Sequence, residues 1–445
     1  VNGGTLTGGS LDVAQLTSVQ SGTILAILTG TGGITKTTAG TLVLEGSNAF
    51  SGTLTISLGT LQVGSGSTTG TLGSGAIVNN DALVFNRAGV YAAENAISGS
   101  GAVSLTGLGT IVLTGANSYV GSTTVSSGLL AIGHSTALGN VTGGTSVADG
   151  AALELRGGIS VLGEALALTG TGIGSTGALR NLSGVNSFGG TVTLGGATLI
   201  RSDAGSLTLG NATAIAASAN AVTFDGAGNL VVSGAITGTT ASLTKNGNGT
   251  LLLSGANTFD GAIAVNAGIL SVGHADALGT IVGGTTVANG ASLQFQGGAA
   301  VLAEAVTLEG VTPVAGPNWT AIEARLAVRQ NGGAPVILTP QARNFWSPPQ
   351  STSESALLTK WNGQLYAVIG QQAEVGVVIG PRSEEVVPRM VEPHAVVAID
   401  EVGGEERIGP LILYLHYERV VFGAVIGVVE RRGHRVFVGG VRLAV

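Results

Sequence analysis

Short apolar runs separated by glycine make up most of the chain. Runs of four to six residues rich in Thr, Val, Ile and Leu alternate with Gly or Gly-Asn, and no helical period is present. Because side chains alternate along a strand, Leu251 and Leu253 are expected to face one way and Leu252 the other. The pattern predicts an all-β fold of many short strands joined by tight turns.

The strands belong to long internal repeats. The segment that starts at Val103 aligns without a gap with the segment that starts at Leu243, and an earlier copy begins at Ile34. In a β-helix, like side chains must recur at the same position of successive repeats, because the coils stack them into aliphatic ladders. A β-sandwich or β-barrel does not require this recurrence. Proline, which cannot donate a backbone hydrogen bond, is absent from residues 1–310. We therefore predict a right-handed parallel β-helix over residues 1–310.

One turn has the same signature in every copy, an asparagine followed two residues later by an aromatic residue. Asparagine tolerates a left-handed corner and can bond its own backbone, and the aromatic ring can cover a seam between coils. We interpret the turn as structural; the alternative is that the aromatic side chains are exposed and contact a glycan or a protein. The pairs are Asn48 with Phe50, Asn117 with Tyr119 and Asn257 with Phe259.

Composition changes after residue 312, because all ten prolines and all three tryptophans lie beyond it. Residues 1–310 include 6 Lys and Arg against 13 Asp and Glu, a net charge of 6 − 13 = −7, and the remainder of the chain has 12 of each. We predict a repeat β-helix at 1–310, a small β-rich module at 311–370 and an unassigned valine-rich tail at 371–445. The negative charge argues against nucleic-acid binding, and the absence of cysteine excludes disulfides and thiolate metal sites.

No signal peptide and no apolar run of about 18 residues is present, and Val1 lies inside a strand-like run. We interpret the sequence as an internal fragment.

The repeats resemble a known family, the autotransporter-associated β-strand repeat, also called the passenger-associated transport repeat. Only the copy at Lys245 matches in full; in the copy at Leu105, Gly107 stands at the family's usual lysine position. The resemblance implies a passenger that reaches the surface of a Gram-negative bacterium through an outer-membrane translocator barrel, although no run of amphipathic barrel strands is present in this sequence. The residues that carry it are Leu243-Thr244-Lys245, Gly249-Thr250-Leu251, Leu253-Ser254-Gly255-Ala256-Asn257-Thr258-Phe259, Gly261, Val265-Asn266-Ala267-Gly268 and Leu270.

Residues 316–370 are similar to a periplasmic segment of the CcmF-type haem lyase subunit of cytochrome c maturation. That family works through transmembrane helices, membrane-bound histidines and a tryptophan-rich segment, none of which this chain contains, so no haem ligand is carried over. We interpret the segment as a fused module or a relic of gene fusion, and the unmatched tail suggests a chimeric or frame-shifted end. The matching points are Gly316-Pro317-Asn318, Leu338-Thr339-Pro340, Arg343, Ser351 to Glu354 and Asn362-Gly363-Gln364-Leu365-Tyr366, with Trp319 in place of the usual Tyr.

Two histidines occupy one repeat position without predicting a catalytic site. Asp276 and Ser271 lie near His274 in the sequence and suggest nucleophilic chemistry, but the copy with His134 lacks this combination. We interpret both histidines as residues of solvated turns. The chain has five histidines, and no two of them have the HxxxH spacing that would indicate a metal site. In the other copy, the corresponding places are assigned to Ser135 and Thr136.

Polysaccharide lyases and hydrolases with β-helical folds are the enzymatic alternative, and they need carboxylates close together on one face. Between the two long copies only Glu164 and Glu304 persist, and Asp203 and Asp225 are isolated among glycines. The calcium-binding nonapeptide pattern is also absent. We predict no catalytic, cofactor-binding or metal-binding residues and no enzymatic activity. The acidic positions compared are Asp149, Glu154 and Glu164, which correspond to Asn289, Gln294 and Glu304.

The sequence therefore predicts a non-catalytic, secreted surface passenger that acts as a stalk or an adhesin. A glycan or a host-surface protein would bind the outer face of the coils, weakly at each repeat but many times over. A fragment of a cytochrome c maturation protein fused to repeats and a polysaccharide-active β-helix are the alternatives.

Overall fold

A computed structural model describes residues 2–14, 19–296, 299, 301 and 305–309 with their side chains, and the backbone of Gln15 and of short strands beyond residue 312. The chain divides into two compact units, Val1–Glu304 and Ala305–Val445.

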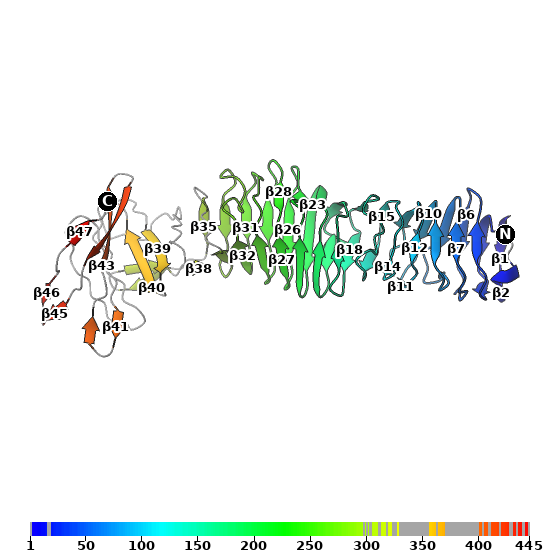
Figure 1. The fold of residues 1–445 in the computed structure, drawn as a ribbon, viewed down its shortest axis with the longest axis horizontal. Helices are drawn as coiled ribbons and strands as arrows, with labels where there is room; N and C mark the ends of the chain where they lie inside the picture. The colour runs from blue at the N-terminus through cyan, green and yellow to red at the C-terminus, as the bar shows by residue number, and fades with distance from the viewer. Residues whose placement is uncertain are drawn as a thin grey trace. The chain divides into compact units, whose positions relative to one another are not determined.

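The first unit is a parallel β-helix of about 14 coils (Figure 1), as predicted. Three columns of strands run along it, and strands of one column on successive coils pair in parallel; the second column is interrupted between β4 and β11 and the third between β12 and β19. The first column contains β1 (Asn2–Leu6), β3 (Ser21–Ile24), β6 (Thr41–Leu44), β8 (Thr60–Val63), β10 (Ala82–Phe85), β13 (Ala102–Leu105), β15 (Thr123–Val125), β17 (Thr145–Val147), β20 (Leu166–Gly170), the start of β23 (Val192–Ser202), β25 (Thr213–Ala216) and β28 (Ala235–Thr237).

The second and third columns have the same parallel pairing. The second contains β2 (Ser10–Asp12), β4 (Ile27–Thr29), β11 (Val90–Ala93), β14 (Thr110–Leu113), β16 (Leu129–Ile132), β18 (Ala152–Leu155), β21 (Leu179–Asn181), the end of β23, β26 (Val222–Asp225), β29 (Leu243–Lys245), β31 (Ile263–Val265) and β33 (Thr285–Val287). The third contains β5 (Ile34–Lys36), β7 (Leu54–Ile56), β9 (Ile77–Asn79), β12 (Ile97–Ser98), β19 (Ser160–Val161), β22 (Val185–Phe188), β24 (Ser206–Leu209), β27 (Asn229–Val232), β30 (Thr250–Leu253), β32 (Ile269–Val272) and β34 (Ser292–Phe295). Two 3-10 turns, Val13–Gln15 and Ile173–Ser175, are the helical elements of the described residues.

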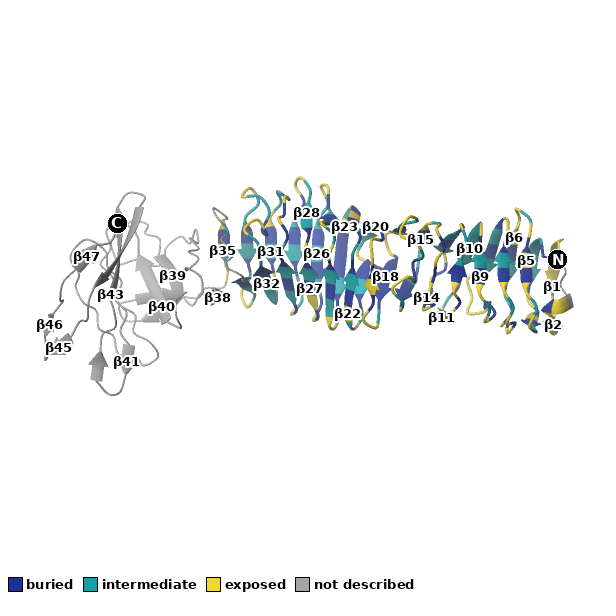
Figure 2. Cartoon of the chain, viewed as in Figure 1, coloured by how far each residue is buried: buried dark blue, intermediate teal, exposed yellow. Residues whose placement is uncertain are grey.

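Aliphatic ladders fill the interior, and Figure 2 shows that buried positions recur on strands along the whole β-helix. Leu230, Leu251, Leu270 and Leu293 lie opposite one another on successive coils and are all buried, whereas Leu252 is partly exposed. Burial of each such leucine contributes roughly 1.5–3 kcal/mol. The predicted alternation and stacking are therefore confirmed; the handedness stays a prediction.

The turn asparagines differ from the prediction, because none of them has a positive φ. Asn117 is buried; its Oδ1 accepts from the Ile97 N–H (2.9 Å) and its Nδ2 donates to the Ala137 carbonyl (2.7 Å). Each asparagine thus binds the coil before and the coil after it, not its own backbone. Asn48 and Asn257 make the same contacts, with Leu28 and Thr71 and with Ile236 and Ala277 respectively.

The aromatic residues of these turns lie inside the helix. Phe50, Tyr119 and Phe259 are at most 1% exposed, so the alternative of exposed aromatic contacts is wrong. The Tyr119 hydroxyl bonds the Thr123 Oγ1 at 2.6 Å, and burial raises the pKa of Tyr119.

The three repeat copies lie on different sides of the coil. Their second strands are β6, β14 and β30, which belong to the first, second and third columns respectively. The equivalent asparagines Asn48, Asn117 and Asn257 are therefore not separated by whole numbers of coils. Each copy begins one side further round than the previous one.

The second unit contains antiparallel pairs, in agreement with the predicted β-rich segment. The predicted divisions at residues 310 and 370 stay predictions. Its strands are β35 (Val306–Leu308), β36 (Pro313–Gly316) with β37 (Trp319–Ile322), β38 (Ala327–Val328), β39 (Ala356–Trp361) with β40 (Gln364–Ile369), β41 (Asp400–Val402) with β42 (Glu405–Arg407), β43 (Leu411–Tyr417) with β44 (Val420–Ile426) and β47 (Val441–Leu443), and β45 (Glu430–Arg432) with β46 (Arg435–Phe437).

Candidate functional site

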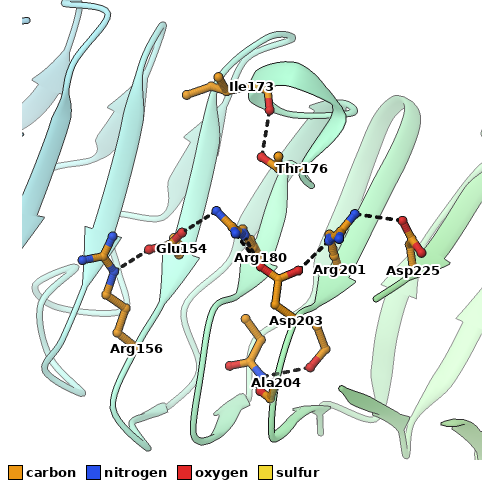
Figure 3. Close-up of polar contacts among 11 residues, drawn as sticks. Glu154, Arg156, Ile173, Thr176, Arg180, Arg201, Asp203, Ala204 and Asp225 are labelled. Atoms are coloured by element: carbon orange, nitrogen blue, oxygen red, sulfur yellow. Dashed lines mark hydrogen bonds and ion pairs between the residues drawn. The ribbon is translucent and has the colours of Figure 1, made fainter. Parts of the chain in front are cut away.

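Six charged residues lie together on the second column of strands (Figure 3), and we call them the charge ladder. Arg180 lies opposite Arg201, and Glu154 and Asp225 lie opposite Arg180 and Arg201 on the flanking coils. Alternation along these strands turns the arginines outward, because their neighbours on both sides are buried. The ladder consists of Glu154, Arg156, Arg180, Arg201, Asp203 and Asp225.

Every carboxylate of the charge ladder accepts from a guanidinium group. Arg180 Nη1 is 3.0 Å from Glu154 Oε2, and Arg180 Nε is 2.6 Å from Asp203 Oδ2. Arg201 Nε is 2.5 Å from Asp203 Oδ1, and Arg201 Nη1 is 3.1 Å from Asp225 Oδ2. Arg156 bonds the other oxygen of Glu154, whose side chain is only 1% exposed.

The pairing decides what the charge ladder can do chemically. Burial raises the pKa of Asp203, but hydrogen bonds from Arg201 and Arg180 outweigh burial and lower it overall. The hydrogen bond from Arg201 to Asp203 likewise raises the pKa of Arg201. With three positive and three negative side chains, the ladder neutralises itself. Asp203, held ionised in this way, is a poor proton donor and is therefore unsuited to act as a glycosidase acid.

The sequence-based prediction that Asp203 and Asp225 are isolated is wrong. The two residues are separated by about one coil, so stacking brings each of them next to an arginine. Arg180 and Arg201 are also about one coil apart, so their spacing in the sequence matches that of the two aspartates. Charges of opposite sign at the coil spacing could have revealed the ladder.

Of the other acidic positions compared in the sequence, those that the structure describes do not converge. Glu164 is buried, accepts from Thr145 Oγ1 at 2.7 Å, and has a pKa raised by burial, which the hydrogen bond partly opposes. Asp149 is exposed, and Glu304 lies outside the described residues. In the other copy, Asn289 is exposed and Gln294 is partly exposed.

The two repeat histidines, His134 and His274, lie in surface turns, as predicted. His274 Nδ1 accepts from the Asp276 N–H at 3.0 Å and is 3.7 Å from Asp276 Oδ2, and both side chains are well exposed. The buried Ser271 hydroxyl has no hydrogen-bond partner, so it is not bonded to His274. His134 makes the equivalent contact with the Thr136 N–H. By strand register the counterpart of Ser271 is Ala131, not Ser135.

Within the part of the chain that the structure describes, no three His, Cys, Asp or Glu side chains cluster in a way that could hold a metal ion. The described residues also contain no helix long and apolar enough to span a bilayer.

Two protein families match separate parts of the chain, and both agree with the resemblances inferred from the sequence. The passenger-associated-transport-repeat matches residues 34–63, 104–132 and 243–272. The CcmF C-terminal beta-sandwich matches residues 287–383, which begin within the last described coils of the β-helix.

Two known proteins are similar to short segments. The adhesin BmaC autotransporter of Brucella suis biovar 1 is 41% identical over 73 residues, 16% of this chain and 2% of that protein. The cytochrome c-type biogenesis protein CycK of Bradyrhizobium diazoefficiens is 34% identical over 73 residues, 16% of this chain and 11% of that protein. The matched segments thus span a small part of either relative. No solved structure matches the chain.

Proposed function

We propose that the β-helix is a non-catalytic passenger on the surface of a Gram-negative bacterium and acts as a stalk. Three matches to the passenger repeat, at 34–63, 104–132 and 243–272, carry this proposal. Each matched segment contains at least three complete strands and the asparagine turn that binds the neighbouring coils. The repeat is therefore the unit that fastens one coil to the next.

The physical form suits a spacer. At about 4.8 Å per coil, about 14 coils extend roughly 70 Å along the axis. The self-neutralised charge ladder and the single Glu164–Thr145 pair support a structural role rather than a catalytic one.

Surface exposure can be tested by placing the full chain between an export signal and a translocator barrel in a Gram-negative host. We expect protease added to intact cells to remove the chain, and the released β-helix to resist further digestion. Leu251→Asp, which puts a charge into the interior ladder, is the matched control and should abolish that resistance. A chain that stays protected inside intact cells would contradict the proposal.

An adhesive role is the finer possibility within this proposal. The name of the Brucella relative supports it, and the outer face would present polar side chains to a glycan or a host protein. A glycan and host-protein array probed with the full chain tests it. Saturable binding supports adhesion, whereas its absence on the array supports a stalk alone.

A second candidate is a role of residues 287–383 in cytochrome c maturation. The match to the CcmF C-terminal beta-sandwich and the similarity to CycK favour it. Haem titration of the full chain tests this role. A saturable shift of the Soret band supports a role in cytochrome c maturation, and an unchanged spectrum argues for a fused module that lacks this role.

A further inference from the structure

Two lysines lie inside the β-helix, which is rare for a charged side chain. Lys245 is 1% exposed, and its Nζ donates to the carbonyl oxygens of Asn246 (2.5 Å), Gly247 (2.7 Å) and Ala267 (3.2 Å). The first two carbonyls belong to the turn after β29, and the third belongs to the next coil. We call these three acceptors the carbonyl corner.

The first repeat has the same corner. Lys36 is fully buried, and its Nζ donates to the carbonyls of Thr38 and Leu58, the latter at 3.0 Å. In the gapless alignment of the first and third repeats, Thr38 and Leu58 correspond to Gly247 and Ala267. The ammonium group therefore joins two successive coils in both copies.

The middle repeat has no lysine at this place. In the gapless register Leu105 takes the position of Lys245, because Leu105 lies opposite Val125 as Lys245 lies opposite Val265. The assignment of this position to Gly107 from the sequence is therefore wrong by two residues. Leu105 is buried and donates nothing to the corner.

In the middle repeat a serine donates to the carbonyl corner in place of the lysine. Ser127 Oγ donates to the carbonyls of Thr106 (2.7 Å) and Gly107 (3.1 Å), which are the counterparts of Asn246 and Gly247. Ser127 itself stands where the third repeat has Ala267 and the first has Leu58, which is 48% exposed. The hydroxyl thus reaches the same acceptors from the outer side.

The charge near the corner differs between the middle and third repeats. One coil before Lys245 lies Asp225, which interacts favourably with the ammonium group. The equivalent place one coil before Leu105 is held by the neutral Asn86. In the first repeat the equivalent place, one coil before Lys36, is held by the neutral Gln20, and the acidic residue near Lys36 is Asp81 on a later coil.

The corner leaves little room for another group. A Cβ on Gly268 would lie 2.5 Å from the Gly247 oxygen, and one on Gly128 would lie 2.4 Å from the Gly107 oxygen. Both glycines also have positive φ, +67° and +71°. The same tight turn is therefore built in both copies, and only the donor differs.

We propose that the carbonyl corner is a binding site for one primary ammonium group, filled from inside by Lys36 and Lys245 and replaced from outside by the Ser127 hydroxyl. Each repeat is fastened to the next coil by one such donor, and the two kinds of donor are exchangeable.

Amide hydrogen exchange of the full chain, measured by mass spectrometry, tests whether lysine and serine can replace each other as the donor. Ser127→Ala should speed amide exchange about tenfold in residues 104–132 and leave residues 243–272 unchanged. Leu105→Lys added to Ser127→Ala should restore slow exchange. Unchanged exchange in Ser127→Ala, or equal exchange in the single and double variants, would overturn the proposal.

A second experiment tests ammonium recognition. Lys245→Ala removes the atoms of a propylammonium ion, and that ion at millimolar concentration should slow exchange in residues 243–272 relative to sodium chloride at equal ionic strength. Leu105→Ala is the control: it leaves an apolar space, and Ser127 already donates to the carbonyl corner of that repeat. Propylammonium should therefore not change amide exchange in this variant. Absence of a propylammonium effect in Lys245→Ala would overturn the ammonium site.

Discussion

At the residue scale, a few buried polar side chains connect neighbouring coils. Asn117, Lys245 and their counterparts each bond backbone groups of an adjacent coil. Unpaired buried backbone groups cost about 1–3 kcal/mol each, so these side chains stabilise positions where strands are interrupted. The sequence predicted that the asparagine turns were structural. It could not show that the asparagine bonds other coils, because that depends on which backbone groups the irregular turn leaves free.

Asn117→Ala should be clearly destabilising. The change leaves the Ile97 N–H and the Ala137 carbonyl without the partner they have in the structure, so we expect a loss of about 2–4 kcal/mol in the free energy of unfolding. Denaturant titration followed by circular dichroism measures it. Asn266→Ala, which removes only an exposed bond to Asn246, is the control. Equal denaturation midpoints for the two variants would contradict a stabilising role of the bonds that Asn117 makes to the two neighbouring coils.

Glu164→Gln should stabilise the protein at neutral pH. Burial raises the pKa of Glu164 in the folded state, so the native chain binds the proton more tightly than the unfolded chain and stability falls as pH rises through this range. Glutamine keeps the acceptor for Thr145 without the charge. Thermal midpoints should favour the variant at pH 7 and converge below about pH 4. A constant difference at all pH values would show that the charge is not the cause.

At the scale of the strand, stacking register explains both the interior and the charge ladder. The alternation at Leu251, Leu252 and Leu253 was predictable because it depends only on the pleat. The pairs Arg180–Asp203 and Arg201–Asp225 were not, because coil lengths vary and a shift of one residue moves a side chain to the other face.

Arg180→Met should destabilise the charge ladder more than its surface position suggests. Glu154 is buried and would retain only Arg156, and Asp203 would retain only Arg201. We expect a loss of about 1–3 kcal/mol in the free energy of unfolding. His274→Ala, which removes only exposed contacts to Asp276, a 3.0 Å hydrogen bond from its N–H and a 3.7 Å ion pair, should leave the denaturation midpoint unchanged. A variant as stable as the parent chain would show that the ladder contributes nothing.

At the scale of the whole helix, each coil contacts mainly its two neighbours, so stability is close to a sum over coils. The composition and repeats predicted this architecture over residues 1–310. They did not predict that the copies lie on three different sides, because the repeat offset does not reveal coil length.

Removal of one whole coil should therefore be tolerated. Deletion of residues 105–124 joins Ser104 to Val125, which already lies one coil above Leu105. We expect a folded β-helix shorter by about 4.8 Å, measurable by small-angle X-ray scattering. Deletion of residues 105–114, about half a coil, moves the following strands off their columns and should abolish cooperative unfolding. If both deletions behave alike, register is not what holds the helix together.

The rotation of the three repeats affects what a partner would meet. A flat surface beside the shaft would face a given repeat feature only once, whereas a ligand that surrounds the shaft would find that feature in three directions at different heights. A copied segment therefore has to stack on the coil beneath it, whatever the direction in which it points.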